Sequence, residues 1–382
     1  AGGPETDRAR DGGNPGSQVV MSTPDPFLIV DAHEDIALNA LTYRRDFTRA
    51  ARLTRQLEQG SPLLAESGIA TTGLPDALLG RVGIIFGTLY VRPCSMPFGS
   101  DPCYETAATA YELALAQLDV YHRLADTTDR IQLIRIQSEL ESVLETWREG
   151  VPFRDHKLGI VVAMEGADPI LEPRQFEEWY ERGVRSVGLA WMAQTRYAGG
   201  NREPGPLTHL GRELLEVMAS HRTILDLSHL AGEAATEALD RYEGPIIASH
   251  SNPRRFCDTD RHLSDTTIRR IAEHDGVIGS VPYNAFLQDG WSKADPKART
   301  PFDRYIAVID HICQVTGSAR HAGIGSDLDG GFGAEATPAD LDTVTDLYRV
   351  GTALEARGYS PDDVRAILGG NFLRILRATL PD

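Results

Sequence analysis

The sequence predicts a (β/α)8 barrel, and three observations lead to this fold class. Short apolar runs bounded by turn residues recur along the chain, as in buried parallel strands. Amphipathic helical segments separate most of these runs, and this alternation is typical of a parallel α/β sheet. Charged or polar residues follow most of the runs, as they do at the carboxyl ends of the strands in barrel enzymes.

The apolar runs define the expected strands of this barrel. We expect eight of them, at residues 27–32, 82–91, 158–164, 185–190, 223–228, 245–249, 276–281 and 322–326. Helical patterns between them include residues 104–125, 134–149, 174–182, 210–221 and 233–242. No Gly-x-Gly-x-x-Gly follows the first run and no Gly-x4-Gly-Lys-Ser/Thr is present, which disfavours nucleotide-binding sheets. Polar groups at most strand ends favour a closed barrel over an open sheet.

Two connections are longer than ordinary βα loops. Residues 42–80, rich in Arg and Leu, predict a helical insertion over the mouth of the barrel after the first strand. Residues 282–304 follow the seventh strand, carry Tyr283 and Trp291, and predict a loop that covers the substrate. Near the end of the chain, residues 360–376 predict a helix capped at Ser360, an interruption at Gly369-Gly370, and a closing helix.

Length, composition and charge limit the possible classes of protein. The 382 residues, 41% of them hydrophobic, suffice for one barrel over residues 25–382, and the Gly- and Pro-rich residues 1–24 predict a loosely attached lead. No run of about 18 apolar residues and no secretory signal is visible, so we expect a cytoplasmic protein with no membrane span. A net charge of −17 without a basic run argues against nucleic acid or anionic membrane as partners.

The four cysteines form no Cys-x-x-Cys pair, which disfavours a thiolate zinc site. Cys94 and Cys103 flank a loop rich in Pro, Gly and Ser and are placed to form a disulfide. The missing secretory signal favours a reducing compartment instead, so the sequence leaves both states of this pair open.

Six residues with metal-ligand chemistry stand at or just after the ends of five predicted strands: His33, Asp35, Glu165, His229, His250 and Asp327. Taken singly, each has an ordinary explanation, such as a helix cap or a satisfied core histidine. Such a set at the ends of different strands instead indicates one site. Three histidines and three carboxylates exceed the needs of one zinc ion and suit two divalent cations.

The spacing of these residues supports a binuclear site. His33 and Asp35 are two residues apart, so on an extended strand end both side chains point the same way. Glu165 ends a buried strand, where a carboxylate needs a partner, and its two oxygens suit a bridge between cations. Two cations about 3.5–4 Å apart activate one water and polarise a neighbouring carbonyl. Imidazole and carboxylate ligands without thiolate favour zinc, with manganese and cobalt as alternatives.

The chain resembles the membrane dipeptidase family of zinc peptidases, part of the wider amidohydrolase-like barrel group. The matching segments run in the family's order and cover most of residues 27–376. They are Val30-Asp31-Ala32-His33-Glu34-Asp35, Ala163-Met164-Glu165-Gly166-Ala167, Asp226-Leu227-Ser228-His229, Ala248-Ser249-His250-Ser251-Asn252, Gly325-Ser326-Asp327-Leu328-Asp329-Gly330 and Gly369-Gly370-Asn371-Phe372-Leu373-Arg374.

The resemblance implies a specific role for each of the predicted ligands. One metal would be held by His33, Asp35 and Glu165, and the other by Glu165, His229 and His250. Asp327 would lie beside the first metal, orient the bridging hydroxide and pass its proton to the leaving amine. Glu165 and Asp327 are therefore the predicted catalytic residues, and relatives suggest a homodimer.

Three further residues are predicted to bind substrate. By the resemblance, Arg261 matches the arginine that binds the free carboxylate of the substrate, for which a guanidinium fork is well suited; Arg254 and Arg255 are competing candidates. Trp191 stands where animal dipeptidases place a histidine, and its indole is a donor but not a cation. It either shapes an apolar pocket or packs in the core. Tyr283 is the third residue, from the long loop.

These observations give three functional hypotheses. The first is a binuclear zinc-dependent dipeptidase that uses a metal-bridging hydroxide. The second is a related metal-dependent amidase acting on N-acyl amino acids, dipeptides with a D-residue or β-lactams, which Trp191 and residues 42–80 motivate. The third is an inactive barrel that only binds a ligand, which the intact set of six metal-site residues disfavours.

Overall fold

The computed structural model of the protein describes Gly2 and residues 27–96 and 99–382. The predicted lead at residues 1–24 therefore lies outside the described residues, apart from Gly2. Within them, eight parallel strands form a barrel that is closed by pairing of β2 with β6, which confirms the predicted fold class. In chain order they are β1 (Ile29–Glu34), β2 (Val82–Tyr90), β6 (Leu158–Glu165), β7 (Val184–Gly188), β8 (Ile224–Asp226), β9 (Ile246–Ala248), β10 (Val277–Ser280) and β11 (Ala322–Ile324).

One strand of the sheet was not expected from the sequence. β5 (Ile131–Leu133) pairs with the first residues of β6, beside the stretch of β6 that pairs with β7. Ile131 and Leu133 are buried and alternate with a half-buried Gln132, which is the pattern of a short strand. The helix predicted from residue 134 accordingly begins later, as α6 (Gln137–Glu145).

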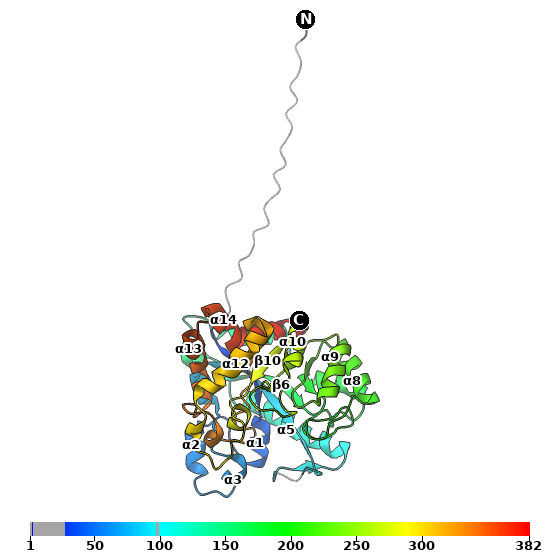
Figure 1. The fold of residues 1–382 in the computed structure, drawn as a ribbon, viewed down its shortest axis with the longest axis horizontal. Helices are drawn as coiled ribbons and strands as arrows, with labels where there is room; N and C mark the ends of the chain where they lie inside the picture. Colours follow the sequence, from blue (N-terminus) through cyan, green and yellow to red (C-terminus); the bar gives the residue numbers. More distant parts are fainter. Residues whose placement is uncertain (1, 3–26, 97–98) are drawn as a thin grey trace.

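Helices surround the barrel strands (Figure 1). They include α5 (Ala107–Thr127), α7 (Phe176–Glu181), α8 (His209–Ser220), α9 (Gly232–Arg241), α10 (Asp265–Glu273), α12 (Phe302–Thr316) and α13 (Arg349–Ala356). Several begin at a side-chain cap: the hydroxyls of Thr106, Thr208 and Ser264 accept backbone N–H groups at the starts of α5, α8 and α10. The faces of these helices that contact the strands supply much of the buried apolar core.

The predicted helical insertion after the first strand is confirmed. It contains α1 (Ile36–Thr42), α2 (Ala51–Leu57), α3 (Leu64–Ser67) and α4 (Leu74–Leu79). Arg45 holds it together, because its buried guanidinium lies 2.8 Å from Glu58 and 3.4 Å from Asp329. Asp329 also accepts the backbone N–H of Thr71 at 2.7 Å, so the insertion is tied to the loop that follows β11.

The C-terminal segment is continuous where an interruption was expected. α14 (Pro361–Arg365) begins at the predicted Ser360 cap, and a π-helical turn (Ala366–Gly370) connects it to α15 (Asn371–Thr379). The turn brings Gly369 so close to β1 that a Cβ there would lie 2.6 Å from the carbonyl oxygen of Leu28. The buried Asn371 amide then donates to the carbonyls of Ala319 (2.7 Å) and Ala322 (2.8 Å), joining α15 to β11.

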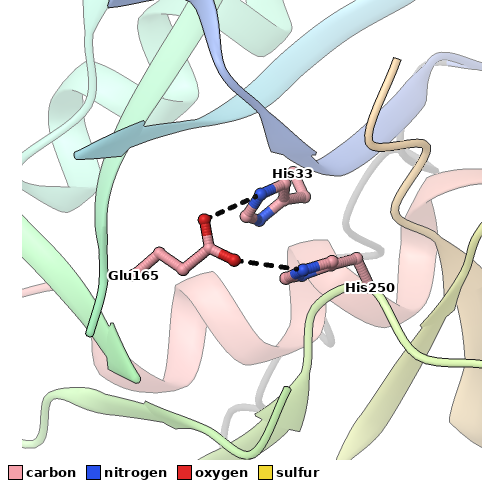
Figure 2. A group of neighbouring side chains, drawn as sticks. All are labelled: His33, Glu165 and His250. Atoms are coloured by element: carbon pink, nitrogen blue, oxygen red, sulfur yellow. Dashed lines mark ion pairs between the residues drawn. The ribbon is translucent and has the colours of Figure 1, made fainter. Parts of the chain in front are cut away.

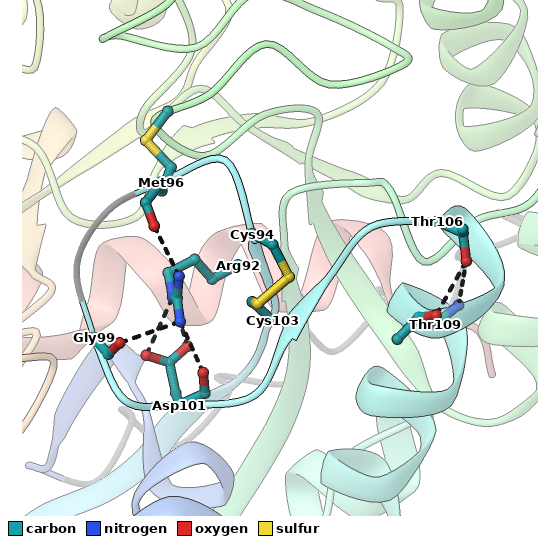
Figure 3. The surroundings of a disulfide bond; sticks show 8 residues. All are labelled: Arg92, Cys94, Met96, Gly99, Asp101, Cys103, Thr106 and Thr109. Carbon is teal, nitrogen blue, oxygen red and sulfur yellow. Dashed lines mark hydrogen bonds and ion pairs between the residues drawn. A yellow bond between two sulfur atoms is a disulfide. The ribbon is translucent and has the colours of Figure 1, made fainter.

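A disulfide between Cys94 and Cys103 closes the loop that connects β3 (Arg92–Pro93) to β4 (Cys103–Tyr104) (Figure 3). Of the two states that the sequence left open for this pair, the structure contains the bridged one. The side chain of Arg92 extends into the loop, where its guanidinium is 3.2 Å from Asp101 and donates to the carbonyl of Met96 at 2.9 Å. Cys257 and Cys313 are free and buried.

Within the described part of the chain, no helix has both the length and the apolar character needed to cross a membrane.

Replacing Asn371 with alanine is expected to lower the free energy of unfolding by roughly 2–3 kcal/mol, since two buried carbonyls lose their donor. Chemical denaturation measures the change. Ser360→Ala, which removes the exposed cap of α14, serves as a reference and is expected to cost about 1 kcal/mol. A smaller effect for Asn371→Ala than for Ser360→Ala would contradict the proposed link between α15 and β11.

Thiol titration tests the disulfide directly. In denatured but unreduced protein we expect two reactive thiols per chain, from Cys257 and Cys313, and four after reduction. Four thiols before reduction would show that Cys94 and Cys103 are not bridged.

Candidate active site

The six predicted metal-site residues converge at the carboxyl end of the barrel. His33 lies near the end of β1, and Asp35 follows that strand directly at the start of α1. Glu165 is the last residue of β6. The other three residues stand in the loops that follow β8, β9 and β11, namely His229, His250 and Asp327.

Glu165 occupies the centre of this group and faces imidazoles on two sides (Figure 2). One carboxylate oxygen, Oε2, lies 3.6 Å from Nε2 of His33. The other, Oε1, lies 3.0 Å from Nε2 of His229 and 3.4 Å from Nε2 of His250. Each oxygen of this carboxylate therefore has its own nitrogen partners, which is the arrangement expected of a bridging ligand.

His33 also connects the two remaining carboxylates to the group. Its Nε2 lies 3.6 Å from Asp35 and 3.8 Å from Asp327. The ligand atoms of His33, Asp35 and Asp327 all lie within 4.8 Å of one another, as do those of His33, Glu165 and His250. The site thus contains two overlapping clusters of potential ligands.

The ligand atoms in these clusters are arranged to bind cations rather than to form hydrogen bonds with one another. The Nε2 atoms of His229 and His250 are 3.0 Å apart, and both lie close to the same carboxylate oxygen of Glu165. His33 Nε2 and one oxygen of Asp35 are buried without a hydrogen-bond partner. Buried polar atoms without partners are costly, and imidazole and carboxylate lone pairs that converge in this way suit divalent metals.

Burial governs the protonation of the site. It raises the pKa of Glu165 to about 8 and that of Asp327 to about 7. It also lowers the pKa values of His229 and His250 well below the usual range, which favours the neutral imidazole that ligates metals. Burial likewise opposes the charge of His33, but the facing carboxylates, Glu165 foremost, raise its pKa to about 10.

Hydrogen bonds orient the imidazoles from behind. Nδ1 of His250 lies 2.7 Å from the hydroxyl of Ser249, which in turn donates to Asp226. Nδ1 of His229 lies 3.0 Å from the side-chain oxygen of Asn201. Such partners fix the tautomer and the angle of a ligating histidine.

Asp226 and Asn201 were not predicted from the sequence. Asp226 ends the buried strand β8, and the argument applied to Glu165 would have singled it out. Asn201 lies in a loop with no such signal.

The backbone is left-handed at two of the predicted metal-site residues, His229 (φ 66°) and Asp327 (φ 56°). Residues with a Cβ rarely adopt this conformation, and it is concentrated at functional sites. The turn at Asp327 also requires a glycine nearby, because a Cβ on Gly330 would lie 1.9 Å from the Asp327 carboxylate. Tertiary contacts therefore hold both side chains in place against local preference.

A cavity of about 620 Å³ opens above the metal-site residues. All three predicted substrate-binding residues, Arg261, Trp191 and Tyr283, line it. So do Ala65 and Glu66 of the insertion and several residues of the 282–304 loop, so both long connections lie at the mouth of the barrel as predicted. Leu38, Tyr90 and Met192 also line the cavity, and none of the three was predicted from the sequence.

Among the three candidate arginines, Arg261 is the one that lines the cavity. It is buried, and it donates to the carbonyl of His250 at 2.6 Å and to the hydroxyl of Ser251 at 3.0 Å. Arg254 instead pairs with Asp260 at 2.9 Å, and Arg255 is exposed. The structure therefore supports Arg261 over its competitors.

The sequence matches the membrane dipeptidase family (peptidase family M19) over residues 22–380. An uncharacterized protein from the pqqA 5′ region of Klebsiella pneumoniae is 30% identical over 264 residues, which cover 66% of this chain and 91% of that protein. An uncharacterized dipeptidase of Schizosaccharomyces pombe is 28% identical over 307 residues, 78% of this chain and 71% of the relative.

Solved structures share the fold. A metallopeptidase named dipeptidase AC is 23% identical and superposes with a TM-score of 0.75, covering 94% of this chain and all (100%) of that structure. A metallopeptidase from Rhodobacter sphaeroides, solved with a phosphinate mimic of the dipeptide L-Ala-D-Ala, is also 23% identical, with a TM-score of 0.73 over 93% of this chain and 100% of its own. With a family match that spans nearly the whole sequence, this chain belongs to the membrane dipeptidase family (peptidase family M19) and is a metal-dependent hydrolase of the dipeptidase type.

Proposed function

We propose that this dipeptidase is a binuclear zinc enzyme that hydrolyses the amide bond of dipeptides. One observation carries the proposal: the two oxygens of Glu165 face different imidazoles, with His33 on one side and His229 and His250 on the other. A carboxylate placed in this way is suited to hold two cations at once.

These distances are compatible with the two ligand sets that the family resemblance implies. The first site would consist of His33, Asp35 and Glu165, and the second of Glu165, His229 and His250. Neutral imidazoles with carboxylates and no thiolate favour zinc. When bound, two such cations supply Lewis acidity that activates a water molecule and polarises the carbonyl of the substrate.

Asp327 is placed to handle the proton. Its carboxylate lies 3.8 Å from Nε2 of His33, and the residue lines the cavity, so it can reach both the first site and a bound substrate. In this role the carboxylate accepts the proton of the attacking water and delivers it to the nitrogen of the leaving amine.

Arg261 is placed to bind the free carboxylate of the substrate. Its guanidinium lies at the cavity wall beside His250, and its Nε is buried without a partner. A bidentate pair with a carboxylate would use this donor. Tyr283, whose ring stacks on Phe332 at 4.4 Å, flanks the same wall.

A second candidate function retains this machinery but changes the substrate to an N-acyl amino acid, a dipeptide with a D-residue or a β-lactam. Trp191 motivates it, because an indole in the cavity supplies apolar surface where a cationic imidazole would otherwise bind substrate. The Rhodobacter sphaeroides neighbour, which binds a mimic of L-Ala-D-Ala, makes D-residue dipeptides a specific member of this class to test. The ligand-binding barrel without activity is disfavoured by the complete set of metal-site residues.

Metal content and Glu165→Gln test the binuclear proposal together. The purified protein is expected to bind two zinc ions per chain and to lose dipeptide hydrolysis on chelation. Mutation of a residue that only hydrogen-bonds to a metal ligand typically costs roughly 10–100-fold in metal affinity or activity. Loss of a ligand shared by both metals should therefore lower kcat/KM by about 100-fold or more. Metal analysis should also show reduced occupancy of both sites.

Glu149→Gln provides the control, because Glu149 is exposed and precedes β6. Full zinc content and full activity in Glu165→Gln would refute the proposal that Glu165 is a ligand shared by both metals.

Arg261→Lys tests carboxylate recognition. We expect KM for dipeptides to rise about 10–100-fold, because lysine cannot reproduce a charged, bidentate hydrogen bond worth roughly 1.5–3 kcal/mol. For a dipeptide with a C-terminal amide, which lacks the carboxylate, Arg261→Lys should raise KM much less. Arg254→Lys is the matched control. An equal rise in KM for that variant would contradict the proposal that Arg261 binds the substrate carboxylate.

A further inference from the structure

A small apolar cluster lies apart from the main core and reaches the substrate cavity. It consists of the buried residues Tyr90, Met96, Trp191 and Ala193, with Leu38 and Met192 packed against them. The members that also line the cavity, called here the apolar wall, are Leu38, Tyr90, Trp191 and Met192. Apolar side chains that line a cavity beside a polar centre are typical of a subsite for an apolar group.

The topology of the barrel separates the apolar wall from the residues predicted to bind the substrate carboxylate. Tyr90 ends β2 and Trp191 follows β7, and the strand between them is β6, whose Glu165 pairs in register with Tyr90. Arg261 and Tyr283 follow β9 and β10. In the closed order of strands, β10 is four strands from β6 in either direction, whereas β9 is three strands from β6 and two from β7.

This placement defines which part of a substrate meets the apolar wall. A substrate whose carboxylate is bound at Arg261 must extend across the metal-site residues to bring its amide to them. The group on the far side of that amide, the acyl side, then extends toward the part of the cavity that Tyr90 and Trp191 line.

The apolar wall is held in position by its surroundings. The ring of Tyr90 meets that of Trp191 edge-on, with centroids 4.9 Å apart, and the side chain of Gln117 accepts the backbone N–H of Tyr90 at 2.9 Å. Met96, a buried member of the same cluster, lies in the loop that the Cys94–Cys103 disulfide closes (Figure 3). A wall fixed before binding loses little conformational entropy when a ligand docks.

Among the described residues near the apolar wall, apart from the predicted metal-site carboxylates, the charged groups are either paired or exposed at the rim. Asp101 is buried, but its carboxylate pairs with Arg92 at 3.2 Å. Glu66 and Arg202 line the cavity and are exposed to solvent. The interior of this side therefore offers apolar surface, and a charged group placed there would lose hydration without gaining a free partner of its own.

We propose that the apolar wall is the acyl-side subsite and that it selects substrates with a large apolar group on that side of the scissile amide. The proposal rests on the proposed function. The shared chemistry is a hydrocarbon group next to the carbonyl, supplied either by the N-terminal side chain of a dipeptide or by the chain of an N-acyl amino acid.

The first test uses the unmodified, zinc-loaded enzyme and substrates with alanine as the constant leaving residue. kcat/KM is measured for Gly-Ala, Leu-Ala, Phe-Ala, Asp-Ala, Lys-Ala and N-octanoyl-alanine. One or two apolar contacts of this kind are worth roughly 10–200-fold, so Leu-Ala and Phe-Ala should exceed Gly-Ala, Asp-Ala and Lys-Ala by at least about 10-fold. N-Octanoyl-alanine above Leu-Ala would identify the acyl chain as the source of the apolar group, and the reverse order would identify the side chain.

The outcomes separate the two proposals. Cleavage of all the dipeptides at similar rates would overturn the apolar subsite and leave the dipeptidase intact. Preference for Asp-Ala or Lys-Ala would overturn it in the same way. Cleavage of no member of the series would overturn the proposed function and, with it, this inference.

Trp191→Ala locates the preference on the apolar wall. The ratio of kcat/KM for Leu-Ala over Gly-Ala should fall at least about 5-fold, because the indole supplies much of the apolar surface. Trp191→Phe should retain most of the ratio. Tyr348→Ala is the control, since Tyr348 is an exposed aromatic residue in a groove with Phe27 and Arg81, at the amino end of the strands.

Zinc content and the unfolding transition of each variant show whether it is folded. An unchanged ratio in folded Trp191→Ala would remove Trp191 from the subsite, and the substrate series on the unmodified enzyme decides the proposal even where a variant is unstable.

Discussion

The burial of Glu165 among three imidazoles and two further carboxylates is the constraint around which this protein is organised. A carboxylate at the end of a central strand, removed from water, is costly unless opposite charge surrounds it. Here its oxygens face His33 on one side and His229 and His250 on the other, while Asp35 and Asp327 approach His33. So many convergent lone pairs fit a pair of divalent cations, and the peptidase family to which the chain belongs uses metal chemistry.

The barrel contributes rigidity to this arrangement. The strands bring residues that are far apart in the sequence to one end of the molecule, and a second layer fixes their angles through Ser249, Asp226 and Asn201. His229 and Asp327 adopt a backbone conformation that side chains ordinarily avoid. The stability of the surrounding fold maintains this local strain, and the metal-site geometry depends on it.

The substrate cavity has two chemically different sides. Arg261 and Tyr283 form a side suited to a carboxylate, whereas Tyr90 and Trp191 form an apolar side. Most of the predicted metal-site residues line the same cavity. Under the proposed function, this asymmetry would orient a substrate: the guanidinium would bind its charged end, and the aromatic rings would accommodate its apolar end.

Much of the fold, and the convergence of the candidate site residues, could be predicted from the sequence. The eight apolar runs became the eight barrel strands, and the helical insertion formed where the long connection predicted it, because strand periodicity and loop length are local properties. The convergence of the six predicted metal-site residues was also expected from their positions at strand ends, since parallel strands bring their carboxyl ends to one face of a barrel.

What the sequence left undecided depended on contacts between distant segments. β5 was missed because a three-residue strand exists only through its pairing with β6. The Gly369-Gly370 pair became part of a π-helical turn because the packing of Gly369 against β1 favours continuity there. Packing likewise decided that Arg261, of the three candidate arginines, lines the cavity, that Asn201 contacts His229, and that Met96 joins the cluster of Trp191. Periodicity along a chain indicates which face of a helix or strand is buried, but not which distant residues that face contacts. In this protein, those contacts shape the cavity.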